Sequence, residues 1–363
     1  MTDLEKRAIR HMYRTNPIPF MQLGFRVLHP GIKYQHNWSI DMLGEALARC
    51  QRRETTRLII NMPPRSLKSI CASVIFPSWV LGVQPESKIL CIAGNRSLAD
   101  EQCHLAHSLM THDRYRGLFP HVRVSEQPGR LKLQQGGIRH GLTPTGSVTG
   151  KGADMIIVDD PQSPIEAEIP SKCKALNTWY DRNIYQRLNN KHDGVIIVVM
   201  QRLSEDDLTA HLLKQEGWEV LNLPAIAMQD EYLPKSLGGG LARLKGEALH
   251  PTRESREELR EALVRMGACA FMSQYQQNPY PRGHPDVRGG AHHIAPHPDA
   301  TEEECRGSPS FFATLPESQF VLERVFRERI CVRPGSSPQL TVENWIKSFG
   351  GEQPQRIDHD QIE

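Results

Sequence analysis

Runs of apolar residues recur along the chain and carry little polar alternation. They are Arg57–Met62, Lys88–Ala93, Met155–Val158 and Gly194–Met200. Continuous runs of this length are typical of strands in a parallel sheet that is covered on both faces. Between them apolar residues follow a helical spacing, from Ser69 to Leu81, Ser97 to His112 and Ser171 to Leu188. The alternation predicts an α/β fold, a doubly wound and mainly parallel sheet with helices on both faces.

Two further regions extend this prediction. Residues 120–146 have the pattern of short strands separated by glycine turns, and Trp218–Leu223 is expected to be a last strand. Before the first run, Trp38–Cys50 has helical spacing. We expect Trp38 to belong to the core.

The segment after the first run has the chemistry of a phosphate-binding loop. A predicted strand leads through a tight turn to Lys68 and Ser69, where a helix begins. In such a loop, backbone N–H groups and the helix dipole face phosphate. The lysine reaches the β- and γ-phosphates and the hydroxyl of Ser69 holds Mg²⁺. We predict nucleotide binding by Pro64, Arg65, Ser66, Leu67, Lys68 and Ser69.

The loop departs from the usual pattern at two positions. Met62 and Leu67 stand where glycines are expected six residues and one residue before the lysine. Glycine lets the backbone approach phosphate without a Cβ in the way. A Pro-Pro turn capped by Ser69, at the start of an ordinary helix, is the alternative interpretation.

A pair of carboxylates ends the third apolar run. Asp159 and Asp160 follow Met155–Val158 and precede Pro161. Ligands of open α/β sheets bind at the carboxyl ends of the strands. We predict that Asp159 coordinates Mg²⁺ and that Asp160 orients or deprotonates the attacking water. An Asp-Asp-Pro turn without function is the alternative, but both motifs in this order predict an ATPase with a P-loop NTPase-type fold.

Other residues are weaker candidates. Gln35 is a candidate for binding the adenine edge. Gln201 and Arg202, at the end of the fourth run, are candidates for sensing the γ-phosphate. Residues Glu205–Asp207 are expected to cap a helix, because acids favour its first turn.

The glycine- and hydroxyl-rich loop at residues 143–153 contains Thr149 and Lys151. We expect it beside the active site because it leads into the carboxylate strand. It is a candidate for contacting phosphate or a DNA backbone, and a surface loop is the alternative.

Composition narrows the class of protein. The 363 residues contain 44 Lys+Arg against 42 Asp+Glu, a net charge of +2, so any DNA contact must come from local patches. The eight cysteines include no Cys-x-x-Cys pair, which argues against a zinc site and for a reducing compartment. No secretory signal or membrane-spanning run is evident, so we expect a cytoplasmic protein with no membrane partner.

Five motifs in order carry a family resemblance. They are residues 63–69, 149–154, 157–161, 199–202 with 205–208, and 274–279. The series resembles the large terminase subunit of tailed bacteriophages. The resemblance implies an ATPase, with ATP and Mg²⁺, that drives double-stranded DNA into a procapsid through the portal. It also implies a small terminase subunit and the portal protein as partners, a homo-oligomeric ring and the bacterial host cytoplasm.

The resemblance also implies residue roles. Arg65 matches an arginine that stabilises transition-state charge in cis, together with Lys68. Asp159 matches the magnesium carboxylate. Asp160 falls where many terminases have a catalytic Glu, and it has a shorter reach. Gln201 and Arg202 match the motif that couples hydrolysis to DNA movement.

Three segments follow from these patterns: an N-terminal helical, adenine-side segment at residues 1–56, an ATPase domain at 57–282 and an irregular tail at 283–363. Large terminases continue into a nuclease domain of ribonuclease-H type. Residues 283–363 show no apolar strand ending in carboxylates, so we expect no endonuclease activity from this chain. A truncated prophage remnant that keeps the ATPase fold without packaging activity is the alternative.

Overall fold

A computed structural model describes residues 2–146, 150–234 and 240–281. The expected tail at 283–363 lies outside the described residues. The helices are α1 Asp3–Thr15, α2 Pro17–Leu28, α3 Trp38–Gln51, α4 Phe76–Val83, α5 Arg96–Thr111, α6 Asp113–Leu118, α7 Pro164–Ala167, α8 Pro170–Asn183, α9 Leu208–Leu212, α10 Arg256–Met266 and α11 Ala268–Gln274. A π-helix, Ile70–Ile75, precedes α4, and a 3₁₀ turn, Tyr185–Arg187, follows α8.

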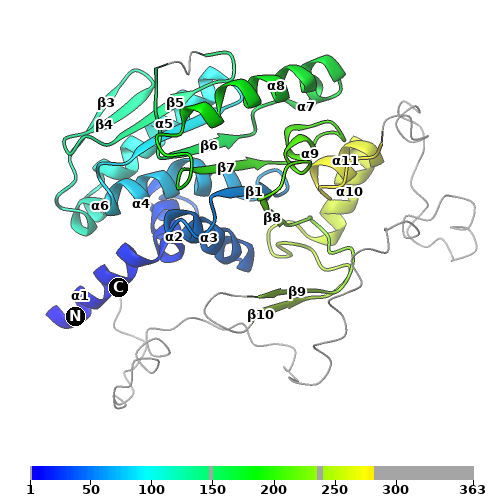
Figure 1. The fold of residues 1–363 in the computed structure, drawn as a ribbon. Helices are drawn as coiled ribbons and strands as arrows, with labels where there is room; N and C mark the ends of the chain where they lie inside the picture. Colours follow the sequence, from blue (N-terminus) through cyan, green and yellow to red (C-terminus); the bar gives the residue numbers. More distant parts are fainter. Residues whose placement is uncertain (1, 147–149, 235–239, 282–363) are drawn as a thin grey trace, which may run out of the picture. The chain divides into compact units, whose positions relative to one another are not determined.

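The strands form an eight-stranded sheet in the order β3-β4-β5-β2-β6-β7-β1-β8 (Figure 1). Their bounds are β1 Arg57–Asn61, β2 Lys88–Ala93, β3 Val124–Gln127, β4 Arg130–Leu133, β5 Ile138–Leu142, β6 Met155–Asp159, β7 Val195–Met200 and β8 Glu219–Asn222. Strands β5, β2, β6, β7, β1 and β8 pair in parallel, whereas β3–β4 and β4–β5 are antiparallel. A separate hairpin consists of β9 Glu231–Pro234 and β10 Gly240–Arg243. The predicted mainly parallel α/β fold is confirmed.

The central strands are apolar throughout because both faces of the sheet are covered. In β1, Leu58 and Ile60 join the core beneath α2–α5, and Ile59 between them joins the core beneath α8 and α9. Figure 1 shows α8 on one face and α2–α4 on the other. Successive side chains of a strand point to opposite faces, so a doubly covered strand needs apolar residues at every position.

The N-terminal helices share the core of the sheet. Phe20 of α2 and Leu43 of α3 are fully buried in the same cluster as Leu58. Trp38, expected in the core, is only partly buried and packs against it. The guanidinium of Arg243 lies over the Trp38 ring, 5.7 Å from its centroid. Helices α2 and α3 thus share a core with the sheet rather than standing apart from it.

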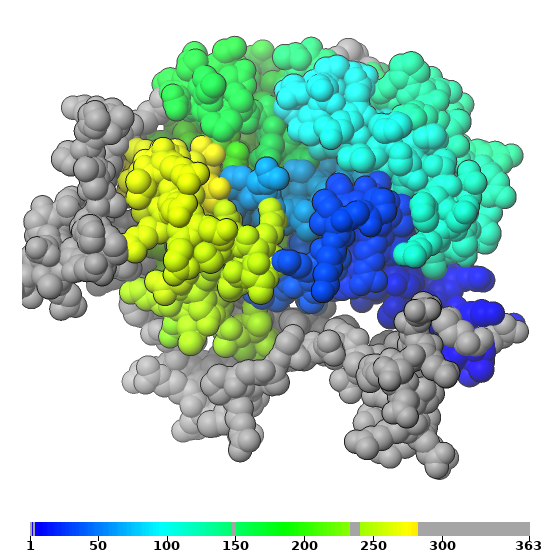
Figure 2. Space-filling model, turned by 180° about the vertical axis from the view of Figure 1, so that it is seen from behind, coloured from blue at the N-terminus to red at the C-terminus, as the bar shows by residue number. Residues whose placement is uncertain are grey.

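A smaller cluster forms around Ala225, Ala248, Leu259 and Phe271. The side-chain amide of Asn37 donates to the carbonyl oxygen of Leu249 at 3.0 Å, which ties this cluster to α3. Figure 2 shows the corresponding yellow-green surface beside the blue N-terminal helices. Among the described residues, no helix has the length and apolar character needed to cross a membrane.

Two details of the predicted elements differ in the structure. The helix expected from Ser97 begins at Arg96 as α5, and its N-cap is Asn95, whose side-chain oxygen accepts from the N–H of Leu98. The predicted helix at 171–188 ends at Asn183. By contrast, the predicted cap near residue 207 is confirmed, because the carboxylate of Asp207 accepts from the N–H of Ala210 at the start of α9.

Asp207 also closes the turn after β7. It is fully buried and accepts from Nε of Arg202 at 2.9 Å and from the N–H of Leu203 at 2.9 Å. A buried carboxylate is tolerated only when it is paired and hydrogen-bonded. This single side chain therefore fixes the direction in which the chain leaves β7.

We predict that Asp207→Ala lowers the free energy of unfolding by about 3 kcal/mol, because it removes a helix cap and leaves the Arg202 guanidinium without its carboxylate. Asp206→Ala, one residue earlier and exposed, is the control and should cost less than about 1 kcal/mol. Chemical denaturation of the purified variants measures both values. Equal losses for the two variants would show that Asp207 has no such role.

Candidate active site

The predicted phosphate loop lies at the carboxyl edge of the sheet, between β1 and the π-helix. Two of its residues, Arg65 and Leu67, have left-handed backbone φ angles of 58° and 65°. Leu67 thus adopts the conformation that glycine usually provides, at a cost of about 1–2 kcal/mol for an L-residue. Its side chain packs against the core. Leu67 therefore preserves a glycine-like turn through strain that core packing compensates.

Lys68 points from this loop to the end of β6. Its Nζ lies 3.1 Å from Oδ2 of Asp160, and the side chain is only 6% exposed. The other oxygen, Oδ1, accepts from the backbone N–H of Gln201 at 3.1 Å. Asp160 itself has a φ of 38°. The structure thus brings the two predicted motifs, 92 positions apart in the sequence, into direct contact.

Asp159 lies beneath this pair and is almost fully buried. Its Oδ1 accepts from the hydroxyl of Ser69 at 2.9 Å, and its Oδ2 accepts from the side-chain amide of Gln102 at 2.8 Å. Burial, and then the neighbouring Asp160 carboxylate, raise the pKa of Asp159 to about 6, while Lys68 opposes the shift. The carboxylate is therefore held in position by neutral donors from two elements.

Sequence reasoning missed two residues that shape this edge. Gln102 on α5 is buried among the apolar residues of that helix, and a polar residue on an otherwise apolar helix face was the available signal. Gly94, which follows β2, lies so close to β6 that a Cβ there would be 2.5 Å from the carbonyl oxygen of Asp160. Gly94 thus permits the close approach of two strand ends at the site.

A cavity of about 270 Å³ adjoins the loop. Gln35 lines it together with the loop residues Pro64, Ser66 and Leu67. Its contact with the adenine edge stays a prediction. The opposite wall, from Leu249 to Glu254, was not anticipated from the sequence. It comes from the segment before α10 and has no motif that marks it.

Arg65 is exposed and lies near this second wall. Burial raises the pKa of Glu254, and the positive charges of Arg253 and Arg65 act against that shift. The charge of Arg65 thus lies near the segment that forms this wall.

Gln201 and Arg202 lie at the same edge but face different groups. The Nε of Arg202 donates to Asp207, and its backbone N–H donates to Oε1 of Gln277 at 2.9 Å. Gln277 belongs to the motif at 274–279, so that motif is tied to the end of β7. Among the described side chains, Oε1 of Gln201 is buried without a hydrogen-bond partner.

Lys151 is not beside the carboxylate pair, contrary to our expectation. It precedes Asp154, whose N–H donates to the carbonyl oxygen of Lys88 at the amino end of β2. A loop that leads into a strand arrives at its amino end, and β6 is five residues long, about 16 Å. Thr149 lies outside the described residues.

The donors at this edge suit a magnesium ion. The hydroxyl of Ser69 and the carboxylate of Asp159 are hard oxygen ligands that lie in contact. Mg²⁺ is usually held by one or two such groups together with substrate phosphates and water. Among the described residues, no group of three His, Cys, Asp or Glu side chains is placed to hold a metal ion. Ser69 and Asp159 are thus the candidate ligands for such an ion.

The fold and this edge define the class of protein: a P-loop NTPase-type α/β fold with a lysine-bearing loop facing a carboxylate pair. No family model matches the chain. A curated large terminase subunit of Enterobacteria phage T3 is 24% identical over 233 residues, which cover 58% of this chain and 38% of that protein. The chain is thus similar to a phage large terminase subunit, as its motifs indicated, and spans well under half of that relative's length.

Two solved structures are among the matches. The large terminase ATPase domain of a Thermus phage matches 70% of this chain and 97% of its own, with 16% identity and a TM-score of 0.47. A large terminase of a thermophilic bacteriophage, solved with ADP, matches 64% of this chain and 52% of its own, with 8% identity and a TM-score of 0.38.

The buried state of Asp159 predicts a pH dependence of stability. Its pKa is higher in the folded protein than the ordinary value of 3.8, so the folded state binds more protons between pH 4 and 6. Stability contributed at this position is therefore lost as the pH rises through that window. Without nucleotide and Mg²⁺, we expect the unfolding free energy of the wild type, relative to Asp159→Asn, to fall by at most about 3 kcal/mol from pH 4 to 7.

Denaturant titrations at several pH values measure this difference. Asp113→Asn, at an exposed position on α6, is the control and should run parallel to the wild type. Parallel curves for Asp159→Asn as well would contradict a raised pKa.

Proposed function

We propose that this chain contains an ATP-hydrolysing motor domain that packages double-stranded viral DNA into a procapsid. The observation that carries the proposal is the contact between the two halves of the site. Lys68 lies 3.1 Å from Asp160, and Ser69 lies 2.9 Å from Asp159. Phosphate and Mg²⁺ binding require these groups to converge on one point. The likeness to a phage large terminase subunit supports the choice of DNA as the substrate that is moved.

In this proposal each residue has a defined task. The loop from Pro64 to Ser69 binds the phosphates through its N–H groups, and Gln35 contacts the base in the adjoining cavity. The ammonium of Lys68 is shared between Asp160 and the β- and γ-phosphates. Ser69 and Asp159 would hold Mg²⁺, which neutralises charge on the phosphates when bound.

Asp160 accepts a proton from the attacking water. Because Lys68 neutralises this carboxylate in the structure, phosphate oxygens compete with Asp160 for the ammonium. Binding of the triphosphate therefore leaves the carboxylate without its full share of the Lys68 charge. Arg65 is exposed on the same loop, and in this proposal its guanidinium stabilises charge that develops on the transferred phosphoryl group.

Gln201 and Arg202 are proposed to pass the state of the site to the rest of the chain. The N–H of Gln201 binds the Asp160 carboxylate directly. Arg202 is joined to Asp207 at the start of α9 and to Gln277, which follows α11. A displacement of the Asp160 side chain would therefore alter the contacts where the chain leaves β7. The portal protein, a small terminase subunit and further copies in a ring are the proposed partners.

We predict that Lys68→Ala lowers ATP turnover at least about 100-fold, with and without double-stranded DNA, because the variant loses its charge on the β- and γ-phosphates. Lys174→Ala, exposed on α8, is the matched control and should keep wild-type turnover. A phosphate-release assay measures both. Unchanged turnover in Lys68→Ala would exclude the proposed site, and wild-type hydrolysis that DNA does not stimulate would argue for an ATPase that moves nothing.

We further predict that Gln102→Leu raises the Mg²⁺ concentration needed for half-maximal nucleotide binding about tenfold. Groups that orient a metal ligand contribute about 10–100-fold to metal affinity. Titration of a fluorescent ADP analogue with Mg²⁺ measures this without relying on turnover. Glu101→Gln, the exposed neighbour on α5, is the control. An unchanged Mg²⁺ midpoint in Gln102→Leu would show that Asp159 needs no orienting donor.

A further inference from the structure

The end of the sheet formed by β3, β4 and β5 has one covered face and one exposed face. Helix α5 covers the first, where Leu131, Leu133 and Arg139 are buried. Residues that lie directly opposite each other in neighbouring strands point to the same side of a sheet. Arg130 pairs with His140, and Lys132 pairs with Ile138, so these residues share the other face.

Register extends the same face across the neighbouring strands. Gln127 of β3 lies opposite Arg130, and Ser125 lies opposite Lys132. On β2, Lys88 lies opposite Ile138. Arg130, Lys132 and Lys88 are all exposed. We call this surface, consisting of Lys88, Ser125, Gln127, Arg130, Lys132, Ile138 and His140, the basic sheet face.

Positive charge dominates this surface. Nε of Arg130 donates to the neutral side-chain oxygen of Gln127 at 2.7 Å, which orients the guanidinium without compensating its charge. Burial lowers the pKa of His140 to about 4, and the charges of Lys151 and Arg130 add to that shift. Lys151 therefore lies within electrostatic reach of the same surface, and His140 is neutral at pH 7.

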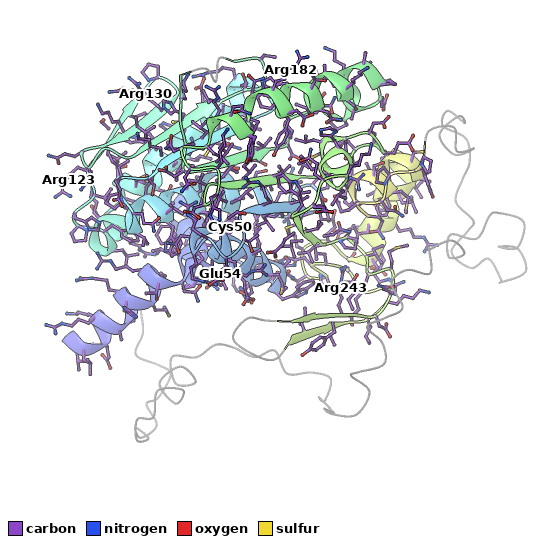
Figure 3. The ribbon with its side chains drawn as sticks, viewed as in Figure 1. Cys50, Glu54, Arg123, Arg130, Arg182 and Arg243 are labelled. Atoms are coloured by element: carbon purple, nitrogen blue, oxygen red, sulfur yellow. The ribbon has the colours of Figure 1, made fainter. Side chains whose placement is uncertain are left out.

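The nearby carboxylates are turned away or occupied. Glu126 on β3 points to the α5 side, where it pairs with His107 at 3.0 Å. Asp154 lies beside the amino end of β2, where its carboxylate accepts from the backbone N–H of Lys88 and from the side-chain amide of Asn189. Figure 3 shows Arg130 projecting outward from the β3–β4 end of the sheet.

We propose that the basic sheet face binds the phosphate backbone of double-stranded DNA without reading its sequence. Across the whole chain the charges nearly cancel, whereas cations outnumber carboxylates on this surface, and such a local patch attracts an anionic partner. Arg130 and Lys132 are two residues apart on one strand, about 6.6 Å. A duplex carries one charge per about 1.7 Å of its axis, so both side chains reach phosphates at once.

The shape of the surface agrees with this partner. Strands β3, β4 and β5 are four to five residues long, and among the described residues the turns that join them contain no helix. Phosphate contacts position a protein on a duplex and carry no base information, which suits a motor that must move along any sequence. This inference rests on the proposed function, and it adds the place where DNA is held. Helix α5, beneath the same strands, carries Gln102, which binds Asp159.

The test compares two double variants of the full chain. Arg130→Gln with Lys132→Gln removes two charges from the basic sheet face. Arg114→Gln with Arg116→Gln removes two from exposed positions on α6, and serves as the control. Fluorescence anisotropy of a labelled 30-base-pair duplex, titrated between 50 and 200 mM KCl, gives the affinity and its salt dependence.

For the first variant we expect the slope of log K against log salt to become less steep by about 1.8, since each phosphate contact contributes about 0.9. DNA stimulation of ATP turnover should fall with it, while basal turnover and thermal unfolding stay as in the wild type. A wild-type slope in the first variant, or an equal change in the control, would overturn this surface. Wild-type protein that hydrolyses ATP but does not bind the duplex would instead overturn the packaging function itself.

Discussion

Two adjacent carboxylates at the end of one buried strand are the constraint on which the site depends. Asp159 is almost fully buried and Asp160 is 27% exposed at its side chain, so their charges repel in a place that water screens poorly. The two carboxylates are stabilised by the cation Lys68. They also accept hydrogen bonds from neutral donors, which are the side chains of Ser69 and Gln102 and the N–H of Gln201. Each donor comes from a different element, so the carboxylate pair joins the loop, α5 and the end of β7.

That requirement explains where the chain accepts strain. Leu67 and Asp160 both have positive φ angles. Leu67 directly precedes Lys68, and Asp160 is the residue with which Lys68 pairs. Each conformation costs energy for a residue with a Cβ. Relaxing either turn would move the ammonium or the carboxylate away from its partner. Gly94 contributes in the opposite way, because the absence of a side chain lets β2 end against the carbonyl oxygen of Asp160.

Much of the fold was predictable because the signals are local. Apolar runs identified the doubly covered strands, and the acids before α9 identified a cap that Asp207 provides. The position of Lys68 against Asp160 also followed, since both lie at carboxyl ends of parallel strands. The proposed roles of Arg65, Gln201 and Arg202 stay predictions, because geometry alone assigns no step to them.

The remaining parts depend on contacts that no local pattern records. Gln102 binds a carboxylate 57 positions away, and the wall of the cavity at residues 249–254 meets a loop near residue 65. We expected Lys151 beside the carboxylate pair because it is close to β6 in the sequence. The loop that contains it reaches the amino end of β6, whereas the carboxylates lie at the other end. The charges of the basic sheet face were visible in the sequence, but only the strand register shows that they share one side.

We propose that the loop and the carboxylate pair together bind one nucleoside triphosphate and its Mg²⁺ ion. A crystal structure with Mg²⁺ and a non-hydrolysable ATP analogue tests it most directly. We expect the β- and γ-phosphates at Nζ of Lys68, the metal at the hydroxyl of Ser69 on the Asp159 side, and the base in the cavity lined by Gln35. Nucleotide bound elsewhere, or Lys68 still paired with Asp160 and untouched by phosphate, would contradict it.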